Sequence, residues 1–516
     1  MKILVTGGTG VVGTGAIPEL LRAGHTVRLL SRHADHDTPA YADGVEAFPA
    51  DVNDSATLAG AVDGCEVVLH IAGIVEEQPP EITFERANVE GTRHMLAAAA
   101  NAGHLRFIHL SSLGADIGKS AYHRSKRAAE ALVQLYSGPW LILRPGNVYG
   151  PGDETISMLL KMLRTLPAVP MVGEGDQQFQ PIWYGDLGRA ICQAVERSEI
   201  NQEILELAGP DITTTEEIFS RLATITGRNP PRLNIPTWVT EVGARAAEVL
   251  GGLGQNLLQQ ARLPMPINTA KLSMLLEGNV IGAGSENALL TRFNIEPASL
   301  RSGLADLVDL LPEQTPGKGF GAIEWTRYFA DIEGTAHTPE ELLDIVCENV
   351  TEIMPLEFAA EPGAPRTANQ GSTLTASIPG RGHIQVRVED RTPTEVTFVT
   401  LEGHPLAGIL RFETSVVEHR LRFAVNIAAQ SANALDWVAM RAFGAAAQSA
   451  NWRDVVSRVV KIAGGTAPRG VQSEAAVLNE EEARRLATAT ERLVQERQRR
   501  QMENQLNNVH TTAGQR

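Results

Sequence analysis

Short apolar runs alternate with longer amphipathic stretches through the first half of the chain. The runs at residues 3–5, 26–30, 65–73 and 106–110 are rich in Ile, Val and Leu, and they end in small or polar residues. Near-continuous apolar runs of this length are typical of parallel strands buried on both faces of a sheet. Their alternation with helical patterns predicts an α/β domain with a doubly wound parallel sheet.

The first apolar run leads into a glycine-rich turn. Glycine recurs at every third position, at Gly7, Gly10 and Gly13, before a helix-like segment. Such a turn lets the backbone approach a pyrophosphate, and the first amides of the following helix favour its charge. Because tight turns are often glycine-rich, the evidence lies in the position of the triplet between a strand and a helix. We therefore expect a dinucleotide at these glycines and at Val11 and Val12.

The end of the second predicted strand bears on which nicotinamide cofactor fits. An acidic side chain at this place binds the free ribose 2′-hydroxyl, whereas an arginine suits a 2′-phosphate. The chain has Ser31 and Arg32 here. This pair favours NADP(H) over NAD(H). The alternative is that Arg32 is a solvated loop residue with no part in binding.

A tyrosine and a lysine follow the predicted strand that ends at Ser111 and Ser112. Tyr122 and Lys126 are spaced to share one face of a helix. An ammonium group beside a phenol lowers the pKa of the phenol, which suits a proton donor or acceptor for hydride transfer at a carbonyl. A serine at the preceding strand end can hydrogen-bond the substrate oxygen. The pattern predicts the site of an oxidoreductase.

These motifs occur together with others in an order typical of one family. The further motifs are residues 51–52, 70–73, 88–92, 143–153 and 180–187. The chain resembles the extended or atypical short-chain dehydrogenases/reductases, in the branch of sugar epimerases and dehydratases. The stretches at 111–116 and 275–280 resemble the group of the NADPH-binding 39-kDa accessory subunit of respiratory complex I. The similarity covers residues 1–311.

The resemblance implies a role for each matching residue. Tyr122 is expected to be the general acid/base, Lys126 to hold the ribose and lower the pKa of Tyr122, and Ser112, rather than Ser111, to polarise the substrate carbonyl. The expected cofactor contacts are Asp51 and Val52 at the adenine, Ala72 and Gly73 towards the nicotinamide, and Pro145, Asn147 and Val148 beside its carboxamide. The loop between Ser112 and Tyr122 is shorter than in many active members of that family.

Residues 213–312 are predicted to be rich in helices, and in the resembling enzymes such a lobe covers the substrate. Its arginines are scattered and form no cluster that would clamp a nucleotide-sugar diphosphate. The apolar run at residues 235–239 belongs either to a core or to the site of an apolar substrate.

The pattern changes after a stretch rich in Pro and Gly. Period-two alternation predicts strands at residues 384–388, 396–398, 410–414 and 421–427, preceded by a strand at 324–332 and a helix at 339–353 and followed by a long helix at 432–462. This order resembles the helix-grip fold of START-like and polyketide-cyclase-like proteins. That fold implies a cavity for an apolar ligand. The alternative is a filled interior that serves packing or dimerisation.

We therefore expect four segments along the chain. They are an NADP-binding domain with a substrate lobe at residues 1–311, a linker at 312–320, a helix-grip domain at 321–465 and a charged tail at 466–516. The tail mixes Glu and Arg in a helical register with few apolar positions, which is typical of a solvated or frayed helix.

Composition narrows the classes of function. The hydrophobic share of 43% and charged share of 21% are those of a soluble globular protein. A net charge of -16 argues against a general nucleic-acid binder and gives no attraction to an anionic membrane. Cys65, Cys192 and Cys347 lie far apart without metal-ligand spacing, so we expect reduced thiols and no metal. With no leader and no membrane-length apolar run, the chain is expected to be cytoplasmic.

The main hypothesis is an NADP(H)-dependent oxidoreductase or epimerase acting at a hydroxyl or carbonyl carbon of a small, potentially apolar substrate, with an accessory ligand-binding domain. Two alternatives stay open. One is a redox-silent NADPH-binding protein that serves structure, assembly or sensing. The other is a fusion whose second domain carries a lipid to the first. A homo-oligomer is compatible with all three.

Overall fold

The computed structural model describes residues 1–172, 175–235, 278–282, 284–355, 357–378, 381–439, 441 and 445–513. Residues 236–239 of the expected apolar run lie outside the described residues. The same holds for residues 275–277 of the motif that resembles the complex I subunit.

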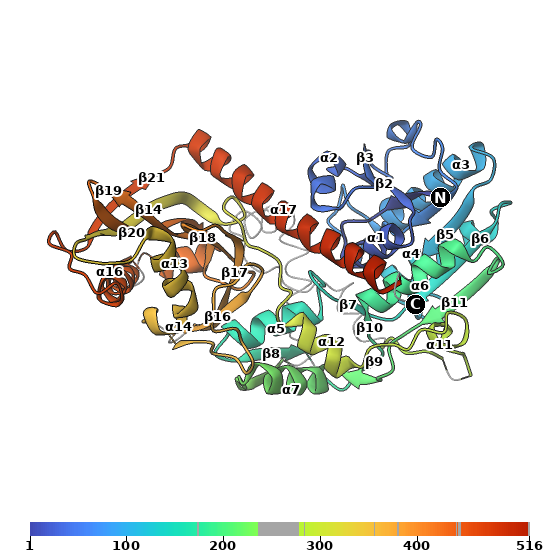
Figure 1. The fold of residues 1–516 in the computed structure, drawn as a ribbon. Helices are drawn as coiled ribbons and strands as arrows, with labels where there is room; N and C mark the ends of the chain where they lie inside the picture. The colour runs from blue at the N-terminus through green and yellow to red at the C-terminus, as the bar shows by residue number, and fades with distance from the viewer. Residues whose placement is uncertain are drawn as a thin grey trace.

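A seven-stranded sheet forms the first domain (Figure 1). Its strand order is β11-β6-β5-β4-β1-β2-β3, and every pairing is parallel. The strands are β1 (Lys2–Thr6), β2 (Thr26–Ser31), β3 (Val45–Pro49), β4 (Val67–His70), β5 (Arg106–Leu110), β6 (Trp140–Pro145) and β11 (Glu203–Leu207). The order reverses at β1, so the carboxyl ends of β1 and β4 form the edge where such sheets bind ligands. The predicted doubly wound α/β fold is confirmed.

Helices cover both faces of this sheet. On one face, α1 (Val11–Arg22) and α6 (Tyr184–Glu196) pack on Ile3 and Val5. On the other face, α3 (Gly91–Asn101) and α4 (Ala121–Gln134) pack on Leu4. The neighbouring positions of β1 therefore serve opposite cores, which is why its sequence is apolar without alternation. Short turns join these elements, namely α2 (Ala34–Asp37), η1 (Thr38–Ala40), η2 (Ser55–Leu58) and the π-helical η3 (Glu85–Glu90).

A smaller lobe follows the parallel sheet and has its own apolar core. Its helices are α5 (Ile156–Thr165), α7 (Thr215–Thr226) and α12 (Leu300–Leu307), whereas α11 (Ala288–Thr291) packs on β11 and the core of the first domain. Its two-stranded pairs are β7 (Val148–Tyr149) with β10 (Ile182–Trp183), β8 (Val169–Val172) with β13 (Arg232–Ile235), and β9 (Gln178–Phe179) with β12 (Thr213–Thr214). The described part of the lobe contains helices, as predicted, together with these short strands.

The second domain contains an eight-stranded antiparallel sheet in the order β15-β16-β17-β18-β19-β20-β14-β21. The strands are β14 (Phe320–Ile332), β15 (Glu357–Phe358), β16 (Thr373–Ile378), β17 (Gly382–Arg391), β18 (Glu395–Thr400), β19 (Leu406–Val417), β20 (Arg420–Ser431) and β21 (Gln472–Val477). Its helices are α13 (Pro339–Glu348), α14 (Val350–Ile353), α15 (Ala434–Ala439) and α16 (Ala445–Ile462). The predicted helix at residues 339–353 is thus divided into α13 and α14, and the described parts of the predicted helix at 432–462 are α15 and α16.

Side chains fill the space between this sheet and α16. Phe412 makes edge-on ring contacts with Phe398, with Phe423 and with Trp452 of α16. These rings belong to a core of buried residues that also includes α13 and α14. The domain is an α+β unit, as predicted, and its relation to START-like proteins stays a prediction.

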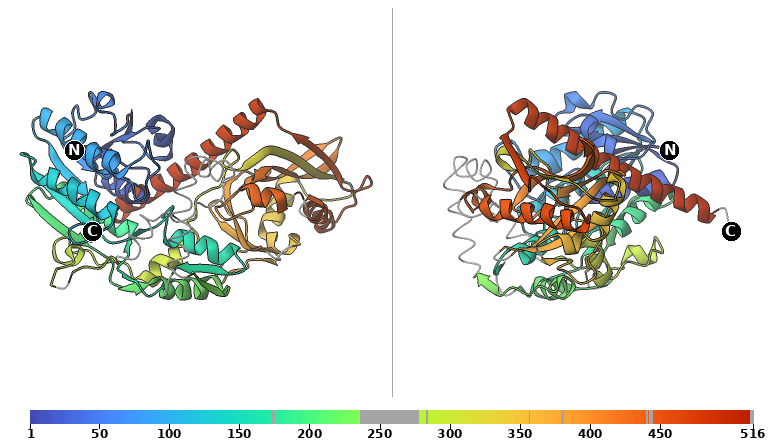
Figure 2. Two further views of the ribbon diagram at one scale, coloured as in Figure 1. Left: turned by 180° about the vertical axis from the view of Figure 1, so that it is seen from behind. Right: turned by 60° about the vertical axis from the view of Figure 1, so that its left-hand side comes forward.

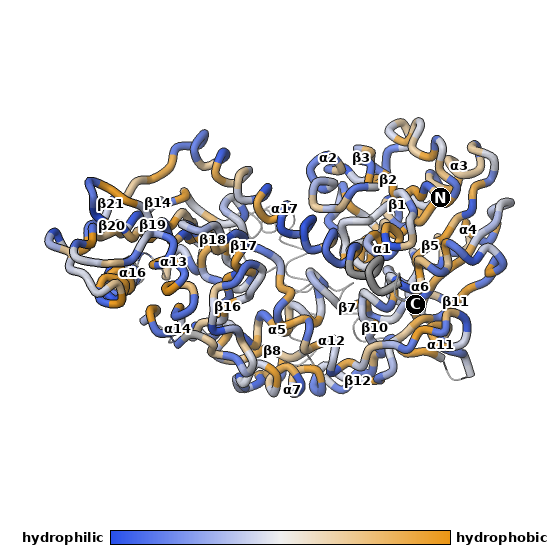
Figure 3. Tube along the Cα trace, viewed as in Figure 1, coloured by the Kyte–Doolittle hydropathy of each residue, from blue (hydrophilic) through white to orange (hydrophobic). Residues whose placement is uncertain are grey.

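The C-terminal helix α17 (Glu480–Ala513) joins the two domains. Figures 1 and 2 show it running from the edge of the antiparallel sheet to the first domain. Hydrophilic and hydrophobic positions alternate along it (Figure 3). Thr490, Val494 and Arg497 are only 2%, 8% and 6% exposed. The expectation of a solvated helix is wrong for this face, because both domains cover it.

Within the described ranges, no helix combines the length and the apolar composition that a membrane span requires. Cys65, Cys192 and Cys347 are free and buried.

Candidate functional site

The glycine turn has the geometry of a dinucleotide cradle. Gly7 has a φ of +70°, and a Cβ at this position would lie 2.6 Å from the amide nitrogen of Ala72. A Cβ at Gly13 would lie 2.2 Å from the carbonyl oxygen of Gly8. Both positions therefore require glycine. Gly10 instead meets only the Gly7 carbonyl at 3.6 Å, and no side chain caps the first amides of α1. These features fit an approaching pyrophosphate.

A buried histidine fixes the end of β4 beside this turn. The Nδ1 atom of His70 lies 2.8 Å from Thr6 Oγ1, and its Nε2 atom lies 3.1 Å from Thr92 Oγ1. Thr6 Oγ1 also accepts a hydrogen bond from the amide of Ala72 (3.2 Å). Burial lowers the pKa of His70 to about 3, so the ring is neutral near pH 7. Ala72 and Gly73 are thereby held next to the turn, with Gly73 exposed.

Three of the predicted catalytic residues meet at this edge of the sheet. Helix α4 begins after Ser120, whose hydroxyl caps it by accepting a hydrogen bond from an amide of the first turn. The Tyr122 hydroxyl is hydrogen-bonded to the side chain of Ser112. One turn later, Lys126 Nζ donates to the carbonyl oxygen of Leu110 (3.0 Å). A Cβ built on Gly73 would lie 3.2 Å from this ammonium group, so Lys126 faces the end of β4.

Burial acts on both ionisable groups of this cluster. It raises the pKa of the Tyr122 phenol, an effect that the hydrogen bond from Ser112 opposes. It lowers the pKa of Lys126 to about 8. Because Tyr122 and Lys126 are 8% and 6% exposed, water screens neither group well. Ser111 is also buried, and its hydroxyl makes no hydrogen bond within the described part of the chain. Ser112 is thus the serine that contacts Tyr122, and its catalytic role stays a prediction.

Asn88 positions the loop that follows Gly73. Its Oδ1 atom accepts from the amide of Ile74 (2.8 Å), and its Nδ2 atom donates to Ser125 Oγ (2.9 Å). Ser125 lies on α4 between the tyrosine and the lysine, so this amide ties the two sides of the site together. The sequence motif at 88–92 contains Asn88, but nothing in the sequence indicates these partners.

Residues expected near the adenine lie at the ends of β2 and β3. Ser31 Oγ donates to Asp37 Oδ2 (2.9 Å), and Arg32 is exposed. Asp51 Oδ1 accepts from the amide of Asn53 (2.9 Å). Val52 is buried against Gly91 at the start of α3. These residues occupy the same edge of the sheet as the glycine turn.

The residues expected beside the nicotinamide lie between β6 and β7. Pro145 ends β6, and its carbonyl oxygen accepts from the amide of Leu113 (2.9 Å), next to Ser112. Val148 begins β7. Asn147 Oδ1 is buried and lacks a hydrogen-bond partner among the described residues. An orphaned amide oxygen at this place fits a ligand that brings its own donor. The residues present therefore fit a nicotinamide dinucleotide.

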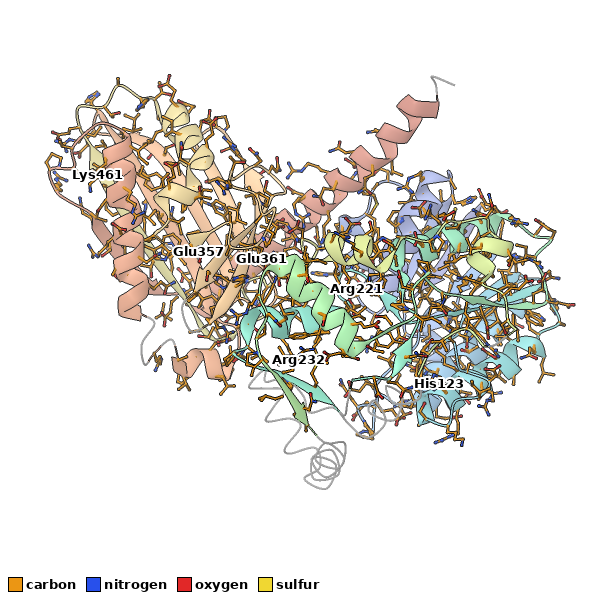
Figure 4. All side chains as sticks on the ribbon, turned by 90° about the horizontal axis from the view of Figure 1, so that it is seen from below. His123, Arg221, Arg232, Glu357, Glu361 and Lys461 are labelled. Atoms are coloured by element: carbon orange, nitrogen blue, oxygen red, sulfur yellow. The ribbon has the colours of Figure 1, made fainter. Side chains whose placement is uncertain are left out.

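Arg144, within the motif at 143–153, is structural. Its guanidinium makes two hydrogen bonds to Glu130 of α4 (2.9 and 2.7 Å) and lies 3.0 Å from Asp116. This buried pair holds β6 to the helix that carries Tyr122. Arg221 and Arg232 lie on the lobe (Figure 4), where Arg232 pairs with Glu216.

Three potential metal ligands meet elsewhere in the first domain. The ligand atoms of His25, Cys192 and Glu196 lie within 4.8 Å of one another. His25 Nε2 already faces Glu196 at 3.4 Å, and Cys192 Sγ is directed at the Glu19 carbonyl (3.6 Å). We interpret the group as a polar contact between α6 and the turn that follows α1. Sequence spacing could not indicate it.

The first domain is similar in sequence to several known proteins. Residues 3–208 match the profile of the NAD dependent epimerase/dehydratase family. The chain is 34% identical over 174 residues to the ceramide reductase of Caulobacter vibrioides, a match that covers 33% of this chain and 54% of that protein. The chain thus spans about half the length of this relative.

Two further similarities extend over more of the chain. The mitochondrial NADH dehydrogenase (ubiquinone) 1 alpha subcomplex subunit 9 of Arabidopsis thaliana is 25% identical over 297 residues, which are 55% of this chain and 71% of that protein. The structure of the UDP-glucose 4-epimerase of Thermus thermophilus in complex with NAD is 22% identical, covers 60% of this chain and 98% of its own, and has a TM-score of 0.45. The match of residues 3–208 to an NAD-dependent family supports a nicotinamide cofactor for the first domain.

Proposed function

We propose that the first domain binds NADP(H) and acts as an oxidoreductase or epimerase at a hydroxyl or carbonyl carbon of a small apolar substrate. One observation carries this proposal. The Tyr122 hydroxyl is hydrogen-bonded to Ser112, and the buried Lys126 follows one helical turn later, at the sheet edge that also holds the glycine turn. A phenol, a hydroxyl and an ammonium group so placed can bind a substrate oxygen and exchange a proton with it.

Each residue of the site has a distinct part in the proposed reaction. Tyr122 exchanges a proton with the substrate oxygen, and Ser112 hydrogen-bonds the same oxygen. Lys126 holds the cofactor ribose and stabilises the phenolate, which opposes the rise in the pKa of Tyr122 that burial causes. The bound nicotinamide supplies or accepts the hydride. Arg32, exposed at the end of β2, is proposed to bind the 2′-phosphate.

The apolar substrate class has two supports. The name of the ceramide reductase to which the chain is similar describes a lipid substrate. In the described part of the lobe, Arg228 is hydrogen-bonded to the carbonyl oxygens of Leu163 and Leu166 rather than placed to bind a diphosphate. Arg245 and Arg262 lie outside the described residues.

The test is a fluorescence titration of the full chain with NADPH and NADH, followed by turnover with long-chain and polycyclic ketones. A second arm of the experiment uses UDP-sugars as substrates. Because an epimerase returns its cofactor unchanged, the products of this arm are identified by NMR. We expect tighter binding of NADPH than of NADH. Tyr122→Phe is expected to bind NADPH as tightly as the wild type and to lose turnover by about 10²- to 10⁴-fold. Unchanged turnover in this variant would contradict the proposal.

A redox-silent NADPH-binding role in structure, assembly or sensing is the second candidate function. It is favoured by the similarity to the plant NADH dehydrogenase subunit and by the buried Tyr122, whose raised pKa disfavours the phenolate. The measurement is the redox state of nucleotide that copurifies with the chain. This candidate is favoured over the proposed oxidoreductase or epimerase if the nucleotide stays bound and no ketone or UDP-sugar oxidises it.

A ligand-carrier role of the second domain is the third candidate. The antiparallel sheet closed by α16 supports this role. However, the rings of Phe398, Phe412 and Trp452 lie between the sheet and the helix, so a bound ligand must displace them. Native mass spectrometry of the full chain tests it and also reports the oligomeric state. A mass equal to the chain plus one nucleotide contradicts the carrier role.

A further inference from the structure

The C-terminal helix α17 reaches the part of the chain that follows Arg32. We call residues 34–43 the α2–η1 segment, because it comprises α2, η1 and the three residues after them. Helix α17 contacts η1 and α1 of the first domain. Figure 1 shows its C-terminal half beside these elements.

Two side chains of α17 hydrogen-bond the main chain of the α2–η1 segment near its two ends. Gln495 Nε2 donates to the carbonyl oxygen of His36 (2.7 Å). The amide of Ala42 donates to Met502 Sδ (3.4 Å). Gln495 and Met502 lie two turns apart on one face of the helix. Because both contacts go to backbone atoms, they fix the course of the segment itself.

Further contacts support this docking. Met502 also packs against the main core of the first domain, which includes Tyr41. Glu491 Oε2 lies 3.3 Å from His36 Nε2, and Arg499 pairs with Asp43 at 2.7 Å. These ion pairs are exposed, so each contributes little to stability by itself. The two backbone hydrogen bonds and the Met502 packing therefore dominate.

The α2–η1 segment is fastened in turn to the proposed cofactor site. The hydroxyl of Tyr41 donates to the carbonyl oxygen of Gly8 in the glycine turn (3.0 Å), and Tyr41 is 8% exposed. Asp37 Oδ2 accepts from Ser31 Oγ (2.9 Å), and Ser31 directly precedes Arg32. The segment thus links α17 to the glycine turn and to the residue proposed to bind the 2′-phosphate.

The second domain fixes the other face of α17. Arg497 lies 2.6 Å from Glu389 of β17 and 2.5 Å from Glu313, which precedes the second domain. All three side chains are buried. A change in the second domain that moves Glu389 therefore moves the helix that holds the α2–η1 segment.

We propose that α17 positions the adenosine half of NADP(H), with Gln495 and Met502 as positioning residues, so that the second domain influences cofactor affinity. This inference rests on the proposed function, because it assumes that the dinucleotide lies between the glycine turn and Arg32. The family match ends at residue 208, so this contribution comes from a part of the chain outside the match. The coupling is reciprocal: cofactor binding stabilises the docking of α17.

The experiment uses the full chain, the double variant Gln495→Ala/Met502→Ala, and Arg492→Ala as a matched control on an exposed position of the same helix. Calorimetric titration with NADPH and with 2′,5′-ADP measures affinity, since 2′,5′-ADP carries only the adenosine half. Hydrogen exchange of residues 34–43 measures the docking. The double variant is expected to weaken both ligands by about fivefold or more, the lower end of typical coupling, and to speed exchange in the segment. The control is expected to match the wild type.

A reciprocal measurement and a milder variant complete the test. NADPH is expected to slow exchange of residues 490–502 in the wild type, and Gln495→Met, which keeps the side-chain length, is expected to show a smaller loss of affinity. Unchanged affinity for 2′,5′-ADP in the double variant overturns the inference, and so does unchanged exchange of the segment. A wild type that binds neither NADPH nor 2′,5′-ADP overturns the proposed function and this inference with it, whereas equal binding by wild type and double variant overturns the inference alone.

Discussion

The two sheets of this protein place their polar side chains in opposite ways. In the parallel sheet, polar groups gather where strands end, and Ser112 after β5 meets Tyr122 and Lys126 from the next helix. Most side chains within these strands are apolar on both faces, because helices cover both, and the exceptions include the buried Arg28, His109 and Arg144. The candidate catalytic residues therefore lie at one edge of the sheet, where parallel sheets commonly bind ligands.

In the antiparallel sheet, polar groups lie along the strand itself. Gln385, Arg387 and Glu389 occupy one face of β17, and all three are buried. Arg387 donates to Glu313 and to the carbonyl oxygen of Leu311 (3.1 Å), so the polar face binds the preceding chain segment. In β17, every second side chain is polar, and this polar face forms an interface between domains. In the parallel sheet, polar side chains at the strand ends form a candidate ligand site.

Arg164 shows how strongly the interface depends on pairing. It projects from α5 and is 2% exposed. Its guanidinium makes two hydrogen bonds to Glu361 (2.8 and 2.6 Å) and one to Gln385 Oε1 (2.8 Å). Figure 4 shows Glu361 where the second domain meets the lobe. A buried charge is tolerated only with such partners.

Lys126→Met tests the candidate site at the strand ends of the parallel sheet, and it has the largest expected effect. Without the ammonium group only the hydrogen bond from Ser112 opposes the raised pKa of the buried phenol, so turnover by the proposed enzyme is expected to fall by about 10²-fold or more. The pH profile is expected to move to higher pH. Steady-state kinetics against pH measure both effects. Lys461→Met, on an exposed position of the second domain (Figure 4), is the control.

Arg164→Met tests the buried polar interface between the lobe and the antiparallel sheet. It leaves Glu361 buried without its main partner, so we expect the free energy of unfolding to fall by about 3–5 kcal/mol. Denaturant unfolding measures this change. Lys161→Met removes a half-exposed pair with Glu402 in the same interface, and a loss of at most about 1 kcal/mol is expected there. Equal losses in the two variants would refute the role assigned to burial.

Arg32→Ala tests whether the site selects the 2′-phosphate. A charge-assisted hydrogen bond to a phosphate contributes about 1.5–3 kcal/mol, so the Kd for NADPH is expected to rise by about tenfold or more. The Kd for NADH is expected to stay the same, which provides the internal control. If both dissociation constants are unchanged, Arg32 is the solvated loop residue of the alternative interpretation.

Glu389→Gln tests the interface through its pH dependence, the smallest effect of the four. Burial and the neighbouring Glu313 raise the pKa of Glu389 from 4.5 to about 7. The folded chain thus binds this proton more tightly than the unfolded chain, and the contribution to stability falls as pH rises through this range. Relative to Glu389→Gln, the wild type is expected to lose thermal stability between about pH 5 and 6.5, as measured by Tm. A parallel Tm profile for the two proteins would exclude this titration.

Most of the first domain could be predicted from the sequence because its determinants are local. Apolar runs predicted the parallel strands, and the glycine spacing predicted a tight turn, where the structure gives Gly7 a positive φ. The sequence placed Ser112 at a strand end and Tyr122 on the following helix, and the structure brings the two side chains together. The catalytic and cofactor-binding roles of these residues stay predictions that the experiments above address.

Other features gave no usable signal in the sequence. Arg164 stands in the last turn of an amphipathic helix, which is typical of a solvated cation, and its partners Glu361 and Gln385 are far away in the chain. The same holds for Arg497 of α17, whose pattern predicted a solvated helix. Whether a charged side chain is solvated or buried depends on what packs over it, and local pattern does not contain that information.

The sequence by itself determined the parallel sheet, the glycine turn and the residues that carry the candidate chemistry, because backbone conformation and periodic burial are set by neighbouring residues. Only the tertiary structure decided that β17 is buried on both faces and that α17 bridges the two domains to the α2–η1 segment. The physical reason is that a polar face becomes an interface only when complementary charges from distant segments replace its water.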